Sequence, residues 1–444
     1  MRPPTNKVFP SLLCLLCVLC VVHWDSPVDA QRISIDITQP NFKRIPIAVP
    51  DFKALSADQA QLAREMGEAL SNDLEYSGVF RPLDPQGFLE NPQTMGLAPG
   101  EIKFADWQRI GADFLARAAY QVQGQAVRIE ARLYDVVGSR MVFGKVYEGD
   151  ARSWRAMVHR FADEILFALT GERGVFDTKI AYVQTQGKNK EIFVVDFDGG
   201  NPVQVTRDQS INLSPAWSPD GSQLAYVSFK EGGTKVYVAN LRSGGHRLLS
   251  GYPGLNIAPA WRPGGSQIAV TLTKGGNPDI YLLSSTGEVL QRLGQGWGIS
   301  VSPSWSPDGR RLAFVSDESG GPQIYVMDVG SGQKKRITFS GNYNTCPAWS
   351  PKGDWIAYSG VSGGSHNIFL VRPDGGETKQ LTHGEGNNEA PTWSPDGRML
   401  AFSSTRQGGS SIWLLLVNGS GVRRLTKTGG GQELPRWSPR LSGQ

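Results

Sequence analysis

Cysteine is scarce in this sequence. Only 4 of its 444 residues are cysteines, and three of them, Cys14, Cys17 and Cys20, stand within the first twenty residues. Their C-x-x-C-x-x-C spacing resembles that of an iron-sulfur site, but they lie in the apolar core of an expected export signal that is cut away, so we expect no such site. Cys346 is the remaining one. It is the one cysteine left if the first thirty residues are removed, so we expect no internal disulfide even in an oxidising compartment.

Histidine is also scarce, with 5 residues in the chain. His159, His246, His366 and His383 lack metal-ligand spacing, and neither H-E-x-x-H nor a P-loop or dinucleotide fingerprint occurs. We place His159 on a helix and the other three in loops, where water or a neighbouring group satisfies each imidazole. The sequence therefore predicts no metal and no cofactor.

A strong charge of one sign and a long hydrophobic run are both missing. The formal net charge is +4 and is spread along the chain, so we expect no nucleic-acid partner. The longest apolar run, residues 8–22, is about 15 residues long, and a membrane span needs about 20. We expect no direct membrane span.

That apolar run has the features of an export signal. Arg2 and Lys7 precede it, and Val28-Asp29-Ala30 follows with side chains that suit a signal peptidase. We expect residues 1–30 to be removed, so that the exported chain starts at Gln31. Acylation of Cys20 is an alternative, but Leu19 is bulkier than the residue expected before an acylated cysteine.

Glycine and proline are abundant, at 53 and 28 residues, without a collagen period. Both residue types occur in the motif "PAWSPDG", residues 215–221, which recurs in variant form along the second half of the chain. Its tryptophan recurs every 44 residues, at Trp217, Trp261, Trp305, Trp349, Trp393 and Trp437. Three other short apolar positions share the period, as in Ile180, Ile192 and Val205. Four strands and four turns per unit are typical of a β-propeller blade.

The register of the repeat favours a closed ring over the alternatives, a solenoid or an open sandwich. The first unit, from Ile180, has no tryptophan strand ahead of it, and the last such strand, residues 435–438, has nothing after it. Pairing the two completes six four-stranded blades and removes the edge strands. We predict an all-β six-bladed propeller closed by pairing of the C-terminal strand with the first blade.

The repeated motif itself is a structural part. Ser218-Pro219-Asp220-Gly221 suits a type I turn, and Trp217 supplies apolar surface between neighbouring blades. A residue present in every blade does not mark one site, so we interpret these tryptophans as packing residues.

An α/β N-terminal domain, residues 31–172, is expected before the propeller, residues 173–444. Ser56 and Gln59 resemble a capping box before a helix with Leu62, Met66, Leu70 and Leu74 on one face. A second helix is expected from Ser153 to Gly171. Alternating residues predict strands at 127–133 and 141–147.

The sequence gives little support for a catalytic function. Gly360-Val361-Ser362-Gly363-Gly364 fits G-x-S-x-G, but that nucleophile elbow needs a strand-to-helix turn, and the repeat predicts a hairpin here. We expect no catalytic residue. The enzyme alternative is the propeller of a serine peptidase, and a further alternative is a propeller that binds a small ligand in its central channel.

The whole pattern resembles the TolB family. The resemblance rests on the repeat, on Thr178–Val183 before the first blade, on Tyr76–Leu83 after the first helix, and on Pro435–Pro439 as the closing strand. It implies a monomeric, non-catalytic scaffold of the periplasmic Tol-Pal system, linking the lipoprotein Pal to TolA of the inner membrane, with other outer-membrane proteins as further partners. Envelope integrity, cell division and protein import would depend on it.

The same resemblance implies two binding regions. TolA would bind the N-terminal segment, whose alternation suits strand addition to a partner sheet: Gln31, Arg32, Ile33, Ser34, Ile35 and Asp36. Pal would bind the propeller mouth, formed by the dissimilar residues before each P-x-W strand. Our candidates there are Asn212, Leu255, Asn256, Ser300, Val301, Tyr343, Asn344, Asn388 and Glu389.

Overall fold

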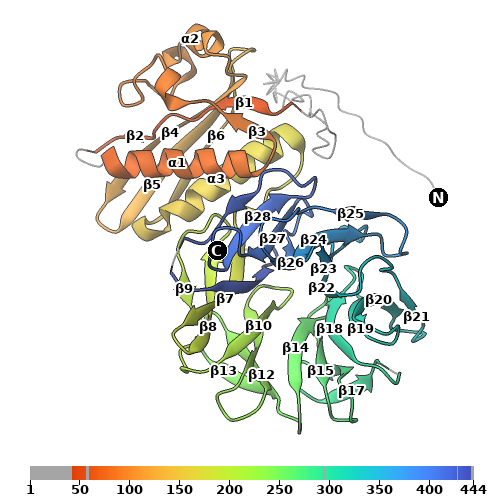
Figure 1. Cartoon of the computed structure of the whole chain (residues 1–444). Coiled ribbons are helices and arrows are strands. Elements are labelled where there is room, and N and C mark those ends of the chain that lie inside the picture. Colours follow the sequence, from red (N-terminus) through yellow and green to blue (C-terminus); the bar gives the residue numbers. More distant parts are fainter. Residues whose placement is uncertain (1–42, 57–59, 295, 428, 442–444) are drawn as a thin grey trace, which may run out of the picture.

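The computed structural model describes residues 43–56, 60–294, 296–427 and 429–441 (Figure 1). The expected export signal, the segment Gln31–Asp36 and the Gln59 half of the capping box lie outside these residues. A helix-covered sheet packs beside a ring of small sheets. No helix within the described ranges is long and apolar enough to cross a membrane.

The N-terminal sheet has the order β3-β1-β4-β5-β6, with β2 paired to β4. Strand β1 runs parallel to β3 and β4, and β4, β5 and β6 form an antiparallel meander. The strands are β1 (Ile45–Ala48), β2 (Lys53–Ala54), β3 (Phe80–Pro82), β4 (Phe114–Gln123), β5 (Ala126–Asp135) and β6 (Arg140–Asp150). The two expected strands of this region lie within β5 and β6.

Two long helices, α1 (Ala60–Tyr76) and α3 (Trp154–Thr170), pack against each other on one face of this sheet (Figure 1). Each has a buried stripe at a spacing of three or four residues, for example Met66, Leu70 and Leu74. Gly171 ends α3 in the left-handed conformation, with φ of 77°, which glycine adopts without steric cost. The short elements are α2 (Phe104–Arg109), η1 (Pro85–Gly87), η2 (Pro99–Glu101) and η3 (Ala151–Ser153).

The propeller consists of six four-stranded antiparallel sheets. The first three blades are β30 (Gln432–Trp437), β7 (Lys179–Gln186), β8 (Asn189–Asp196) and β9 (Val203–Gln204); β10 (Asn212–Trp217), β11 (Gln223–Ser228), β12 (Lys235–Asn240) and β13 (His246–Ser250); and β14 (Asn256–Trp261), β15 (Gln267–Leu272), β16 (Asp279–Ser284) and β17 (Val289–Arg292). The other three are β18 (Ser300–Trp305), β19 (Arg311–Ser316), β20 (Gln323–Asp328) and β21 (Lys334–Arg336); β22 (Asn344–Trp349), β23 (Ile356–Ser362), β24 (Ser365–Val371) and β25 (Thr378–Gln380); and β26 (Asn388–Trp393), β27 (Met399–Ser404), β28 (Ser411–Leu416) and β29 (Arg423–Arg424).

The ring closes as the repeat predicts. The last strand, β30, pairs antiparallel with β7, and Trp437 lies opposite Ile180. The Trp437 indole also donates to Thr178 Oγ1 at 2.8 Å. Chain ends that share one blade leave no blade open at the seam. The predicted fold class, an α/β domain followed by a closed six-bladed propeller, is confirmed.

The tryptophan motif packs blades together, as interpreted. Trp217 lies in a core cluster with Ala181 and Val194 of the preceding blade, and its indole donates to the Arg436 carbonyl at 2.9 Å. In the turn that follows, the Ser218 hydroxyl donates to Asp220 Oδ1 at 2.6 Å. The aspartate therefore holds the turn together as well as tolerating its backbone conformation.

Each inner strand carries a bulge at the residue before its proline. The register shifts there in all six strands, and the residue has φ between 51° and 56°. A left-handed conformation costs a residue other than glycine about 1 kcal/mol, and packing across the ring must offset this strain. The six positions are Ser214, Ala258, Ser302, Cys346, Ala390 and Leu434.

Two histidine placements made from the sequence were wrong. His246 is the first residue of strand β13, and His366 lies in strand β24. Both strands extend into stretches whose glycine and serine content indicated loops. His383 lies in a loop, and His159 lies in helix α3, as expected.

Candidate functional site

The loops before the six inner strands gather at one end of the ring, which we call the mouth. Each inner strand begins with a buried polar residue: Asn212, Asn256, Ser300, Asn344, Asn388 or Gln432. The amides hold the loop that precedes them. Asn256 Nδ2 donates to the carbonyls of Tyr252 and Gly254, and Asn344 Nδ2 donates to that of Ser340. These side chains therefore shape the mouth from below its surface.

Apolar side chains are exposed on the same loops. Leu255 and Tyr343, both on the candidate list, are 40% and 44% exposed. Trp297 is 75% exposed, and Ile211 and Phe229 are 38% exposed. The Phe229 amide donates to the Ile211 carbonyl, so the hairpin that carries Phe229 reaches the same end of the ring. Exposed apolar groups of this kind mark interaction surfaces.

Ion pairs flank these apolar residues. Lys190 pairs with Glu433, and Arg406 contacts Glu385 at 3.2 Å. Glu389, another candidate residue, is exposed and its carboxylate lies 3.7 Å from His366 Nδ1. Val301 is partly buried. Apolar anchors beside a polar rim are typical of protein-binding surfaces.

The nine candidate residues of the mouth thus fall into two groups. Leu255, Tyr343 and Glu389 offer side-chain atoms to a partner, whereas the four asparagines and Ser300 are buried and Val301 is partly buried. The structure adds Ile211, Phe229 and Trp297, which sequence reasoning missed. The signal for them was their apolar character within loops otherwise rich in Gly, Ser and Asn.

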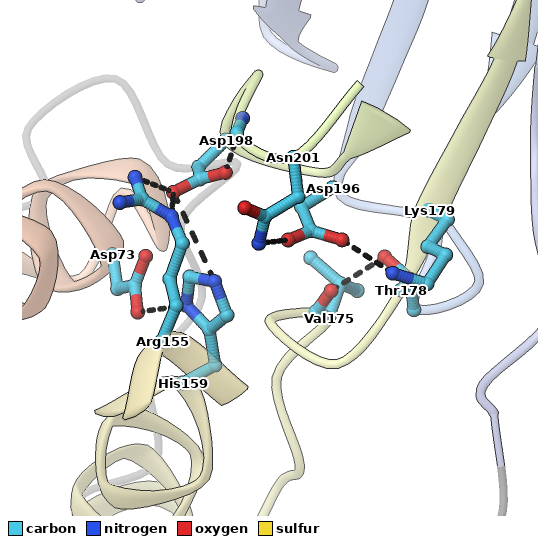
Figure 2. A network of polar contacts seen from close by, with 10 residues as sticks. Asp73, Arg155, His159, Val175, Thr178, Lys179, Asp196, Asp198 and Asn201 are labelled. Atoms are coloured by element: carbon cyan, nitrogen blue, oxygen red, sulfur yellow. Dashed lines mark hydrogen bonds and ion pairs between the residues drawn. The ribbon is translucent and has the colours of Figure 1, made fainter. Parts of the chain in front are cut away.

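A second polar site joins the two domains (Figure 2). His159 Nδ1 on α3 lies 2.7 Å from Asp73 Oδ2 on α1. Arg155, one turn earlier on α3, donates through Nε and Nη2 to Asp198 Oδ2 at 3.0 and 2.5 Å. Asp198 lies in the turn after β8, within the propeller. His159 Nε2 points at the same Asp198 oxygen from 3.8 Å (Figure 2).

Burial sets the protonation of this cluster. It raises the pKa of Asp73 to about 6, against the opposing effect of His159. Burial also lowers the pKa of His159, but the carboxylates of Asp73 and Asp198 outweigh it, and the net direction is upward. For Asp198, His159 and Arg155 together outweigh burial and lower the pKa. These directions favour a protonated His159 beside an ionised Asp198, and Arg155 adds a second positive charge next to that carboxylate.

The ligand atoms of Asp73, His159 and Asp198 lie within 4.8 Å of one another, a separation that a metal ion can bridge. Arg155 already occupies Asp198 Oδ2, however, and a cation placed there would face the guanidinium. These three side chains are therefore better suited to sharing a proton, as a His–Asp ion pair, than to binding a metal ion. We interpret the cluster as an ion-pair network that docks the propeller on the N-terminal domain.

Ser362 is exposed and lies in a hairpin. It pairs with Ser365 across the turn Gly363–Gly364, whose residues both have positive φ. This is the strand-to-strand context that the repeat predicts, and it lacks the helix of a nucleophile elbow.

Two family models match this chain. The TolB amino-terminal domain matches residues 33–142, and the TolB beta propeller domain matches residues 167–441. The chain belongs to the TolB family.

Individual relatives agree with this membership. The chain is 42% identical over 197 residues to the Tol-Pal system protein TolB of Desulfosudis oleivorans, which covers 44% of this chain and 45% of the relative. It is 41% identical over 196 residues to the protein of that name from Syntrophotalea carbinolica, covering 44% and 46%. The chain thus spans less than half the length of these curated relatives. The crystal structure of TolB from Acinetobacter baumannii superposes with a TM-score of 0.78 at 28% identity, covering 89% of this chain and 97% of that one.

Proposed function

We propose that this TolB-family chain is a non-catalytic, periplasmic, protein-binding component of a Tol-Pal system. Its propeller mouth binds Pal, and its N-terminal segment binds TolA. Relatives named Tol-Pal system protein support the assignment to that system. Residues 1–30 are removed on export, which leaves domains 31–172 and 173–444. The link between the two partners serves envelope integrity and cell division.

The observation that carries the proposal is the set of exposed apolar residues at the mouth. Leu255 and Tyr343 stand on loops whose backbone carbonyls accept hydrogen bonds from the buried Asn256 and Asn344. The backbone carbonyl of the exposed Trp297 accepts from Asn277 Nδ2. A surface ordered before binding loses little entropy when a partner docks. Central aromatic residues are also the usual anchors of protein interfaces.

The N-terminal segment is proposed from its sequence alone. Residues 31–36 alternate apolar and polar side chains, which suits pairing with the edge of a partner's sheet. Deleting Gln31–Asp36 should abolish TolA binding and leave Pal binding intact. Loss of both in a folded protein would contradict the division of labour.

The mouth is tested with purified Pal and a matched pair of variants. Leu255→Asp places a charge in the proposed interface, and we expect calorimetry to show at least about tenfold weaker Pal binding. Leu248 on β13 is 49% exposed and lies in the outer strand of its blade, so Leu248→Asp is the control and should bind normally. Undetectable binding of folded Pal by the unaltered chain refutes the proposal, as does equal weakening by both variants.

A further inference from the structure

The central channel of the propeller contains a cavity of about 590 Å³. It extends along the inner strands from the bulged residue, such as Ser214, to the proline of the turn that follows, such as Pro219. Sites for small molecules have volumes of a few hundred Å³ and mostly apolar walls. Prolines and tryptophans of all six blades supply such walls here.

Arg436 breaks the symmetry of this cavity. Among the described residues that line the cavity, Arg436 is the only charged one. The position before the tryptophan is small in the other five blades, where it is Ala216, Ala260, Ser304, Ala348 or Thr392. A single guanidinium therefore stands in a channel that is otherwise neutral.

Within the part of the chain that the structure describes, Arg436 has no acidic partner. Its Nη1 donates to the carbonyl of Pro435, its own neighbour, at 3.0 Å. Among the described residues, none of the recorded ion pairs includes Arg436. Burial lowers the pKa of the guanidinium. The neighbour that opposes this effect is Cys346, whose own pKa is raised by burial, which favours the neutral thiol. A partly buried cation without a counter-ion is costly, and an anionic ligand would relieve that cost.

Hydroxyl groups reach the same cavity. Ser304 Oγ accepts from the Trp349 amide, and Thr392 Oγ1 accepts from the Trp437 amide, so each hydroxyl hydrogen remains able to donate. These donors are a second feature that suits an oxyanion.

We infer that this cavity binds a small organic molecule through a carboxylate that pairs with Arg436. A guanidinium takes a carboxylate in a bidentate geometry, and one cation matches one negative charge. The prolines and tryptophans contact the uncharged body of the ligand. The lining of the cavity begins at the third residue of the inner strands or later, whereas the mouth is formed by the loops before those strands. This site is therefore separate from the partner binding proposed above.

The test compares benzoate with its neutral isostere benzamide by titration calorimetry on the unaltered chain. We expect saturable benzoate binding with a dissociation constant in the millimolar range, and at least about tenfold weaker binding of benzamide. Absence of saturable benzoate binding, or equal binding of the two probes, overturns the proposal.

Two variants localise the binding. Arg436→Ala copies the residue of three other blades, so the fold should accept it, and we expect at least about tenfold weaker benzoate binding. Arg242→Ala, in the exposed turn after β12, is the matched control and should bind as the unaltered chain does. If Arg436→Ala binds benzoate normally, or if the control loses as much, the assignment to the channel is wrong.

A measurement on the unaltered protein covers the case in which the variant does not fold. Crystals soaked in bromide should show anomalous density beside the Arg436 guanidinium. An empty channel, with bromide bound elsewhere on the surface, contradicts the proposal.

Discussion

Arg155 on helix α3 donates to Asp198 Oδ2 of the propeller at 2.5 Å, across the boundary between the two domains. The Asp198 side chain is 3% exposed and that of Arg155 is 26% exposed. Their contact is thus a shielded ion pair, continued by His159 and Asp73. It is the part of the interface on which charge substitutions should act most strongly.

Replacing Asp198 with asparagine should weaken the docking of the two domains. The variant leaves Arg155 and His159 without their shared carboxylate, and losing one partner of a shielded pair costs about 3 kcal/mol. Scanning calorimetry should show a lower melting temperature or a split transition. Asp150→Asn, which removes a pair with the exposed Arg152, is the control and should leave the melting profile unchanged. An unshifted Asp198→Asn profile would show that the cluster does not hold the domains together.

Asp163 should make stability fall as the pH rises. Burial, followed by the nearby Asp177, raises its pKa to about 7 from an unfolded value near 4. The folded protein therefore holds a proton that the unfolded chain releases, and the stabilisation present below pH 4 is lost as the pH rises through 7. Between pH 5 and pH 7 the difference in unfolding free energy between the unaltered protein and Asp163→Asn should change by about 2 kcal/mol.

Denaturant unfolding at several pH values measures this effect. The exposed Asp113 offers a matched control, and Asp113→Asn should keep the pH dependence of the unaltered chain. If the Asp163→Asn variant and the unaltered chain show the same pH dependence, the Asp163 carboxyl titrates alike in the folded and unfolded states, and the prediction is wrong.

Arg436→Ala should stabilise the protein when no ligand is present. The change removes a desolvated cation that has no acidic partner among the described residues, and it installs the alanine of three other blades. Substitutions of this kind commonly add about 1 kcal/mol. Thermal unfolding in a chloride-free buffer measures it. A lower melting temperature would show that the guanidinium has a stabilising partner in the folded protein.

Two tryptophans should separate stability from binding. Trp437 is buried in the closing strand, so Trp437→Ala should destabilise the propeller by about 3 to 5 kcal/mol. Trp297 is 75% exposed at the mouth, so Trp297→Ala should leave stability unchanged and weaken Pal binding. Urea unfolding and calorimetry with Pal provide the two readouts. A strongly destabilised Trp297→Ala variant would place that residue in the core instead.

At the mouth, the sequence predicts the position of the loops but not which of their side chains are exposed. The repeat identifies the loops, because any difference between blades must lie outside the shared motif. It does not say which loop residues face a partner. Asn256 and Asn344 are polar yet buried, whereas Leu255 and Tyr343 beside them are exposed. The hydrogen bonds that the asparagine side chains donate to the loop carbonyls form only in the folded loop. Hydrophobicity alone predicts the reverse, with the asparagines exposed and Leu255 and Tyr343 buried.

The sequence by itself determined the architecture of the propeller. A local pattern that repeats every 44 residues predicts the number of blades, the strand order, the turn chemistry and the closure by β30. Such a pattern can be read from the sequence because its residues are close together along the chain. Only the tertiary structure brought Asp73 against His159, 86 residues later, and Asp198 against Arg155, 43 residues later. It also put Arg436 into the channel. These contacts depend on how domains and blades dock, and docking joins residues that share no sequence period.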